Sequence, residues 1–440
     1  METLIRHLEN YQAHLDSVEP MRIDGRVSQI KGLVVEATAR EATIGDVCHI
    51  DIQPRGHITA EVVGFQDERV WLMPLGETVG VYPGARVRRS PRPLTVPIGE
   101  CLLGRIIDGL GRPIDGKGPL NATKSRSIYA APPNSLVRQR IETPLTTGLR
   151  AIDGLLTLGK GQRVGIFAGS GVGKSVLMGM ISRYTDADVN VIALIGERGR
   201  EVREFLERDL GEEGLKRSVV VVATSDQAST VRVKGAFIAT TIAEYFRDQG
   251  KDVLLLMDSL TRMSMAQREI GLAIGEPPTT KGYTPSVFAQ MPRLLERAGT
   301  GAIGSITGLY TVLVEGGDLD EPISDTARSI LDGHIVLSRK IATSGHYPAI
   351  DILESISRVR NDIISKEQKE ASQKVLELMS VYREAEDLIN IGAYSPGSNP
   401  TIDAAVRHID AIRTFLRQDV GESTSFSETR GRLQTLAGAI

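Results

Sequence analysis

A glycine-rich stretch, GSGVGKS at residues 169–175, has the residue types and spacing of a loop that binds phosphate. It follows the apolar run RVGIFA and precedes the helix-like VLMGMISRY. Glycines at 169, 171 and 173 would allow positive φ, which turns backbone N–H groups toward an anion at a helix N-terminus. We expect Lys174 to reach the β- and γ-phosphates of a nucleotide. The candidate nucleotide-binding residues are Gly169, Ser170, Gly171, Val172, Gly173, Lys174, Ser175 and Val176.

A carboxylate ends another predicted strand, in the stretch KDVLLLMDSLTR at residues 251–262. Ligands bind at the carboxyl ends of parallel strands, so Asp258 is placed to hold Mg²⁺ through water while the Ser175 hydroxyl binds the ion directly. Two simpler interpretations exist: Asp258 could only cap a helix, and the glycine-rich stretch could be a turn with a surface lysine.

A dense cluster of charges, IGERGREVREF at residues 195–205, follows the apolar run VNVIAL. Hydrolysis of a phosphoanhydride needs a group that orients the attacking water, and a carboxylate at a strand end can do this. Glu197 is the first charge after the strand and is the candidate. Arg200 precedes Glu204 by four residues, so the later charges, Arg203 included, are expected to form a solvated helix face with local ion pairs.

The composition sets limits on the function. The chain has 440 residues, 52 basic against 55 acidic, and a formal net charge of -3, too balanced for wholesale binding to nucleic acid or membrane. Cys48 and Cys101 lack the spacing of a zinc site or a disulfide framework, which indicates a reducing cytoplasm. No leader or membrane-spanning segment is predicted, and histidine-based metal binding is unsupported.

Three periodicities predict an α/β protein with several domains. Short β-branched runs predict a small β-barrel at residues 21–92, preceded by an amphipathic helix at residues 1–20. Residues 93–365 alternate apolar strands with helices, which predicts a parallel sheet covered by helices on both faces. Residues 366–440 are predicted to be helical, with Asn399 and Pro400 as the N-cap and first residue of the last long helix.

These motifs together resemble the rotary-type hexameric ATPases, the family that contains the F-type ATP synthase catalytic subunit. The continuation GERGREVREF and the C-terminal INIGAYSPGSNPTIDAAVRHIDAIRTFLRQ are most similar to flagellar and type III protein-export ATPases. The resemblance implies a RecA-like P-loop core that uses ATP and Mg²⁺, with Glu197 and Lys174 as catalytic residues. It also implies that Tyr347 packs on adenine and that Arg358 is an arginine finger presented to the neighbouring subunit.

The same resemblance implies partners. It predicts a homo-hexamer, a dimeric regulator bound at the N-terminal helix, and a central stalk protein facing the Gly- and Pro-rich residues 275–290. Export substrates with their chaperones, and an export gate at the membrane, would complete the apparatus. The expected location is the cytoplasmic face of the inner membrane, with flagellar export favoured over a virulence injectisome.

Several different functions share this core and stay open from the sequence. A synthase catalytic subunit is disfavoured because no acidic lever segment is present. A ring-shaped RNA translocase would need an aromatic, basic barrel, but residues 24–89 contain only Phe65, Trp71 and Tyr82 as aromatics. A non-catalytic ring subunit would lack the catalytic glutamate, whereas Glu197 is present.

Overall fold

The computed structural model describes residues 24–39, 41–314 and 318–440. The predicted partner-binding helix at residues 1–20 therefore lies outside the described residues. The chain forms two compact units, Met1–Leu94 and Thr95–Ile440.

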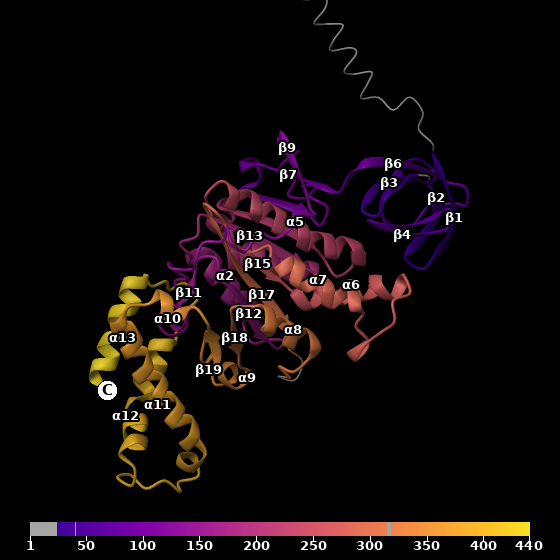
Figure 1. The fold of residues 1–440 in the computed structure, drawn as a ribbon. Helices are drawn as coiled ribbons and strands as arrows, with labels where there is room; N and C mark the ends of the chain where they lie inside the picture. The colour runs from indigo at the N-terminus through magenta and orange to yellow at the C-terminus, as the bar shows by residue number, and fades with distance from the viewer. Residues whose placement is uncertain (1–23, 40, 315–317) are drawn as a thin grey trace, which may run out of the picture. The chain divides into compact units, whose positions relative to one another are not determined.

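The first unit is a closed six-strand barrel, as predicted, with strand order β1-β2-β5-β4-β3-β6 (Figure 1). Alternate side chains point inward and form a core around Val35, Cys48, Ile50 and Leu72, all fully buried. The strands are β1 (Gly25–Lys31), β2 (Val34–Thr38), β3 (Asp46–Asp51), β4 (His57–Gln66), β5 (Arg69–Pro74) and β6 (Arg86–Pro93).

The second unit is built on a sheet of order β19-β18-β12-β17-β15-β13-β14-β8, with β16 paired to β17. All neighbours along this path are parallel except β19, which is an antiparallel edge strand. The strands are β8 (Arg105–Asp108), β12 (Arg163–Ala168), β13 (Val189–Ile195), β14 (Ser218–Ala223), β15 (Asp252–Asp258), β16 (Gly299–Thr300), β17 (Ser305–Leu313), β18 (Gly333–Leu337) and β19 (Ile350–Ser357).

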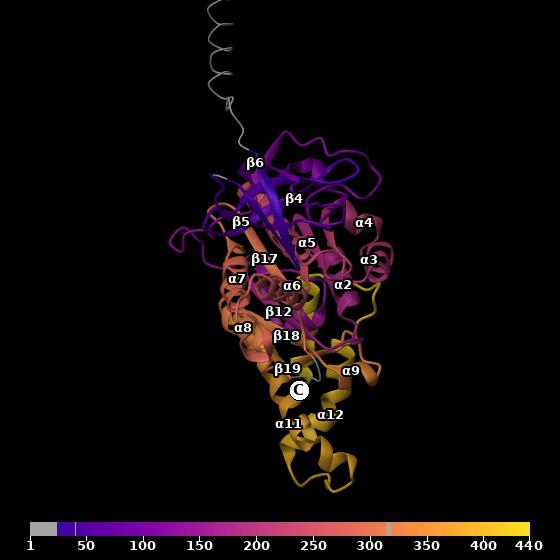
Figure 2. The ribbon, with the colours of Figure 1, turned by 90° about the vertical axis from the view of Figure 1, so that its right-hand side faces the viewer.

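Helices cover this sheet on both faces, as its apolar strands require. Every residue of β13 and β14 is buried, so neither face of these strands meets solvent. Figure 2 shows α7 and α8 on one side of the sheet and α2, α3 and α4 on the other. The helices are α2 (Lys174–Tyr184), α3 (Gly199–Glu204), α4 (Gly211–Lys216), α5 (Ser229–Asp248), α6 (Leu260–Ala273), α7 (Pro285–Leu295), α8 (Pro322–Ile330) and α9 (Arg339–Thr343).

Short elements connect these layers. They are β7 (Thr95–Ile98), β9 (Lys124–Ser127), β10 (Pro144–Leu145), β11 (Leu158–Gly159), α10 (Arg360–Ile363), the 3₁₀ helices η1 (Glu100–Leu102) and η4 (Thr280–Gly282), and the π-helices η2 (Ala151–Leu156) and η3 (Phe205–Leu210).

Three helices end the chain: α11 (Lys366–Asn390), α12 (Pro400–Leu416) and α13 (Phe426–Ala439). The predicted cap of α12 is confirmed, because the Asn399 side chain accepts hydrogen bonds from the N–H groups of Thr401 and Ile402. Buried residues of these helices, such as Val375 and Ile412, belong to the same hydrophobic core as the sheet residues Val164 and Leu256. None of the helices in the described part of the chain has the length and apolar character of a membrane span.

Candidate nucleotide-binding site

The glycine-rich stretch is the turn between β12 and α2, which is the context that a phosphate-binding loop needs. Gly171 and Gly173 take the left-handed conformation, with φ of 74° and 89°. The expectation of positive φ at Gly169 is wrong, since it is not among the glycines in that region. Two left-handed residues suffice to direct the loop into the N-terminus of α2, and Lys174 is the first residue of that helix.

Lys174 lies between two carboxylates that come from two other strands. Its Nζ is 2.5 Å from Asp258 Oδ1 and 3.7 Å from Glu197 Oε1. All three side chains are largely buried, with 12%, 5% and 13% of their surfaces exposed for Lys174, Asp258 and Glu197. The structure thus brings together the predicted phosphate-binding lysine, magnesium-site aspartate and catalytic glutamate at one edge of the sheet.

The strand order explains a contact that the sequence did not indicate. Strand β17 lies between β12 and β15, and Thr311 near its carboxyl end donates a hydrogen bond of 2.7 Å to Asp258 Oδ1. Asp258 Oδ1 therefore accepts from both Thr311 and Lys174. This fixes the orientation of the carboxylate before any ligand binds.

The burial of these charges changes their proton affinity. Burial and the negative charge of Asp258 raise the pKa of Glu197 to about 7, against the opposite effect of Lys174. A hydrogen bond with Glu201 acts in the same raising direction. Burial lowers the pKa of Lys174, but the charges of Asp258 and Glu197 outweigh it, so that this pKa lies above its ordinary value. Lys174 therefore stays charged, and Glu197 can exchange a proton near neutral pH.

The charged stretch after β13 divides into two parts. Glu197 faces the phosphate loop, and Glu201, one helical turn on, touches it. The later charges form the predicted helix-surface pairs, Arg200 to Glu204 at 2.9 Å and Arg203 to Glu207 at 2.7 Å. Helical spacing alone does not indicate the contact made by Glu201.

Arg262 is another residue that sequence reasoning missed, although it ends the motif LLLMDSLTR. It lies on α6 beside the turn before Glu197: a Cβ on Gly196 would stand 2.7 Å from Arg262 Cβ. Gly196 has φ of 74°, so only glycine suits this position on both counts. The buried Arg262 Nε has no hydrogen-bond partner among the described residues. A partly exposed guanidinium whose buried Nε has a free donor, beside Glu197 and Lys174, suits an anionic ligand.

Tyr347 lies beside the phosphate loop, against the glycine that precedes Lys174. A Cβ on Gly173 would be 3.5 Å from its ring, and 45% of the tyrosine surface is exposed. Arg339, at the start of α9, donates a hydrogen bond of 3.2 Å to the Ser170 carbonyl. An exposed aromatic face next to a phosphate loop has the position that a stacked base requires.

Arg358 is not brought to this edge. It directly follows β19, where Ser357 pairs with Gly333, while the next residue of β18, His334, pairs with Gly165 of β12. Arg358 therefore lies near the amino end of β12, roughly 16 Å along the sheet from Gly169 at a rise of about 3.3 Å per residue. Its side chain is exposed and donates to the Arg328 carbonyl at 3.3 Å.

Comparison with known proteins identifies the family. Residues 148–357 match the ATP synthase alpha/beta family, nucleotide-binding domain, residues 27–91 its beta-barrel domain, and residues 364–435 the T3SS EscN ATPase C-terminal domain. The chain is 54% identical to the flagellum-specific ATP synthase of Bacillus subtilis, over 94% of this chain and 95% of the relative. The chain belongs to the flagellar and type III secretion ATPases.

Other members of the family agree. The type 3 secretion system ATPase of Xanthomonas euvesicatoria is 51% identical over 92% of both chains. The structure of the assembled ATPase EscN from enteropathogenic E. coli matches with a TM-score of 0.89 and 46% identity, over 94% of this chain and all of that one. EscN in complex with its central stalk EscO matches with a TM-score of 0.87, 46% identity and the same coverage. The protein is therefore an ATP-binding enzyme that hydrolyses ATP in type III protein export.

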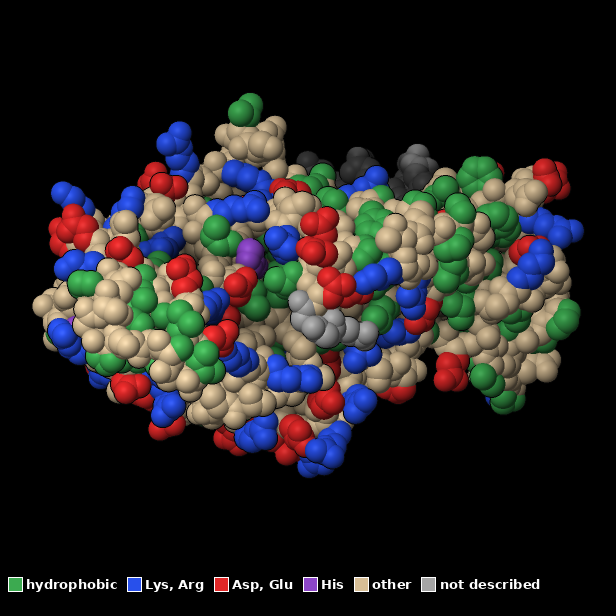
Figure 3. All heavy atoms as spheres, turned by 90° about the horizontal axis from the view of Figure 1, so that it is seen from below, with side chains coloured by type: hydrophobic (Ala, Val, Ile, Leu, Met, Phe, Trp, Pro, Cys, Tyr) green, Lys and Arg blue, Asp and Glu red, His purple; other side chains and the backbone are tan. Residues whose placement is uncertain are grey.

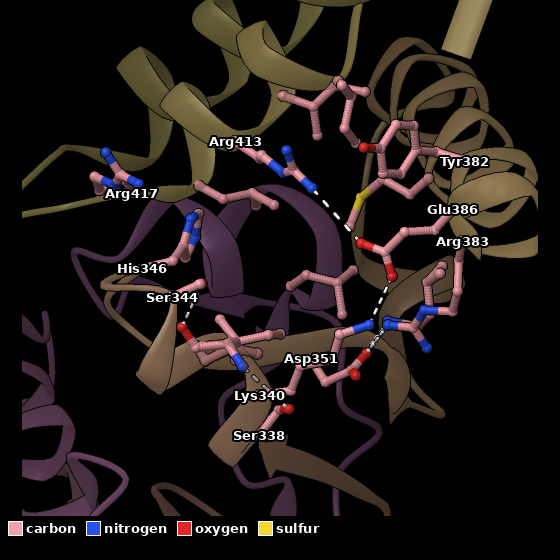
Figure 4. Close-up of a pocket in the computed structure, with 18 residues that line it drawn as sticks. Ser338, Lys340, Ser344, His346, Asp351, Tyr382, Arg383, Glu386, Arg413 and Arg417 are labelled. Atoms are coloured by element: carbon pink, nitrogen blue, oxygen red, sulfur yellow. Dashed lines mark hydrogen bonds and ion pairs between the residues drawn. The ribbon is translucent and has the colours of Figure 1, made fainter. Parts of the chain in front are cut away.

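A separate cavity of about 500 Å³ lies between β19 and the C-terminal helices of this ATPase (Figure 4). Glu386 of α11 pairs there with Lys340 of α9 at 2.6 Å and with Arg413 of α12 at 4.0 Å. None of the described residues 169–176 lines this cavity. Its wall includes His346, the neighbour of Tyr347 in the sequence.

Proposed function

We propose that this chain hydrolyses ATP with Mg²⁺ as one of six identical subunits of a ring that energises flagellar protein export. The observation that carries the chemistry is the position of Lys174 between Asp258 and Glu197 at the carboxyl edge of a parallel sheet. One cation for phosphate, one carboxylate for a metal and one for water converge there.

The residues present fit Mg²⁺. Ser175 on α2 and Asp258 on β15 offer hydroxyl and carboxylate oxygens, the hard donors that this ion prefers, and Asp258 is already oriented by Thr311. Asp258 would act through water, as the family resemblance implies. The bound ion would neutralise charge on the phosphate oxygens.

Glu197 would orient and polarise the attacking water. It stands 3.7 Å from Lys174 Nζ, so a phosphate held by the lysine would be close to the water held by the glutamate. Lys174 and the free Nε of Arg262 would stabilise the charge on the phosphoryl group as it is transferred. The charge of Lys174 acts more strongly there than in water, because its side chain is 12% exposed and little solvent screens it.

Arg358 would act on the site of the next subunit. Its place at the amino end of β12 is too far from its own phosphate loop, and its side chain is exposed where a neighbour could reach it. Tyr347 would hold the adenine ring. In a ring whose subunits complete one another's sites, every copy carries Tyr347 for its own nucleotide and Arg358 for the nucleotide of its neighbour.

The further partners are also part of the proposal. Residues 277–281 are all exposed, which suits contact with a central stalk like that in the EscN–EscO complex. We propose that residues 1–20 bind a dimeric regulator and that substrates with their chaperones reach the ring at the cytoplasmic face of an inner-membrane export gate.

The decisive test is genetic. Deletion of the gene should abolish flagellin export and swimming. Wild-type protein should restore both, and Glu197→Gln at equal abundance should not. If the deletion leaves swimming intact but stops secretion of virulence effectors, the chain serves an injectisome instead.

A nucleic-acid translocase and a synthase subunit have less support. On the face shown in Figure 3, acidic and basic side chains are interspersed, unlike the one-signed surface of a nucleic-acid translocase. Stimulation of ATP hydrolysis by single-stranded RNA would favour a translocase. A synthase subunit would make ATP under a proton gradient and would not be required for export.

A further inference from the structure

The segment between α12 and α13, residues 417–425, is held by one buried arginine, and we call this segment the connector. Arg150 is 4% exposed and precedes η2, more than 260 residues earlier in the chain. Its guanidinium donates through Nε to the Phe415 carbonyl at 2.8 Å and through Nη1 to Thr424 Oγ1 at 3.3 Å. The guanidinium also binds the Arg417 carbonyl and the Glu422 carboxylate. A planar group with donors on three sides is needed to make all of these bonds at once.

Gln418 links the connector and Arg150 to Tyr347 through hydrogen bonds. Its side chain is 3% exposed, accepts from the Arg150 N–H at 2.9 Å and donates to the Gly148 carbonyl at 2.7 Å. Its backbone N–H donates to the Tyr347 carbonyl at 2.9 Å. The connector is therefore bonded to the backbone of the residue that lies against Gly173 of the phosphate loop.

The connector is also tied to the far end of the phosphate helix. Tyr184, the last residue of α2, and Arg183 donate to the Val420 carbonyl at 2.8 and 2.9 Å. Figure 4 shows Arg417 at the end of α12 next to His346, which precedes Tyr347. Tyr347 and α2 are thus both hydrogen-bonded to the connector, and Arg150 holds the connector in place.

We propose that Arg150 is a positioning residue for the base subsite: by fixing the connector, it fixes Tyr347 relative to the phosphate loop. The proposal rests on the assignment of Tyr347 to the adenine ring under the proposed function. Arg150 itself touches neither phosphate nor base, so its effect falls on nucleotide affinity and not on the chemical step.

The test compares ATP with ribose 5-triphosphate, which lacks the base. Both are titrated calorimetrically, with Mg²⁺, into wild-type protein and Arg150→Lys. The lysine keeps the charge but loses the fork, so we expect ATP affinity to fall about tenfold, the scale of a lost base stack. Ribose triphosphate affinity should not change, and kcat at saturating ATP should stay within about threefold. Equal losses for both ligands, or no loss for ATP, would overturn the proposal.

A matched control uses Arg217, which is partly buried and binds the carbonyls of residues 182, 183, 185 and 187 at the end of α2, without contact to the connector. Arg217→Lys should not change the affinity for ATP relative to the affinity for ribose 5-triphosphate. If it changes this ratio as Arg150→Lys does, the effect is not specific to the connector and the proposal is wrong. Gln418→Ala, which removes side-chain bonds only, should reproduce the Arg150→Lys pattern in case Arg150→Lys folds poorly.

A double substitution tests the route. In Tyr347→Ala protein, adding Arg150→Lys should cause no further loss of ATP affinity, since both act on one contact. If the losses of ATP affinity from the two substitutions add, Arg150 does not act through Tyr347. If Tyr347→Ala alone binds ATP normally, the assignment of Tyr347 to the base is wrong and the proposal falls with it. If only Tyr347→Ala weakens ATP, the positioning role alone is wrong.

Discussion

Lys174 and Asp258 form a hydrogen-bonded ion pair of 2.5 Å, although they begin one element and end another, 84 residues apart. The lysine that should receive phosphate is therefore already neutralised by the carboxylate that should receive Mg²⁺. Nucleotide and metal are expected to separate this pair together, because a phosphate without the ion would compete with Asp258 for Lys174 and would face two carboxylates. Tight binding should then depend on the metal.

Asp258→Asn tests that dependence. We expect the affinity for ATP with Mg²⁺ to fall at least about tenfold, since a charged metal-site group is lost. Affinity for ATP in excess EDTA should stay equal or rise, because a competitor for Lys174 is gone. Titrations with a fluorescent ATP in both buffers measure the ratio of the affinity with Mg²⁺ to the affinity in EDTA. Asp252→Asn, at the opposite end of β15, should leave it unchanged, and an unchanged ratio in Asp258→Asn would remove this residue from the metal site.

Glu197→Gln should separate binding from turnover. The amide keeps the size of the side chain but cannot polarise water, so kcat should fall about 10²- to 10⁴-fold while ATP still binds. Phosphate release and equilibrium titration measure the two effects. Glu204→Gln, which loses only an exposed pair with Arg200, is the control and should leave both near wild type. Turnover of Glu197→Gln within a few-fold of wild type would contradict the catalytic role.

The raised pKa of Glu197 predicts the pH dependence of the reaction. Because the carboxylate is the active form and its pKa is about 7, kcat/KM should be constant above this pH and fall up to about tenfold per unit below it. The cause is burial together with the charge of Asp258, so an ordinary exposed glutamate would give a fall near pH 4.5 instead. A pH series of kcat/KM at low ATP measures it, and a flat profile down to pH 5.5 would exclude Glu197 as the titrating group.

The convergence of Lys174, Glu197 and Asp258 could be predicted from the sequence because strand ends in a parallel sheet share one edge. Thr311 could not be, because nothing in the sequence says that β17 inserts between β12 and β15. Arg150 was missed for a similar reason. Its partners lie more than 260 residues away and are mostly backbone carbonyls, which carry no residue-type signal.

A local rule failed in one smaller place. The motif suggested three glycines with positive φ, but Gly169, which directly follows β12, is not left-handed, and the turn needs two. Glu201 keeps the predicted surface position, because its side chain is 48% exposed and pairs with Arg198 at 3.9 Å, and it also touches Glu197. The glycine conformations and the contact with Glu197 depend on how the loop leaves the sheet, which periodicity does not encode.

The place of Arg358 predicts complementation between subunits. Arg358→Ala alone should lose about 10³-fold or more in turnover, and Lys174→Ala should be inactive. A mixture of the two should exceed the sum of the separate activities, because an intact phosphate loop can then meet an intact Arg358 from its neighbour. Replacing the second partner by a Lys174→Ala/Arg358→Ala protein should remove this gain. The absence of any gain in the first mixture would contradict action in trans.

The most buried ion pair predicts a stability effect away from the site. Arg297 binds both oxygens of Glu244, at 2.8 and 2.7 Å, and each side chain is 1% exposed. Glu244→Gln leaves the buried guanidinium without its counter-charge, so the free energy of unfolding should fall by about 3–5 kcal/mol.

The double variant Glu244→Leu/Arg297→Met should lose much less free energy of unfolding than Glu244→Leu and Arg297→Met lose together, because no isolated charge remains. Denaturant unfolding of all three proteins measures this. Arg200→Met breaks an ion pair whose side chains are 84% and 45% exposed, and it should cost less than about 1 kcal/mol. A double variant whose loss equals the sum of the single losses would mean that packing around Arg297, and not its charge, sets the cost.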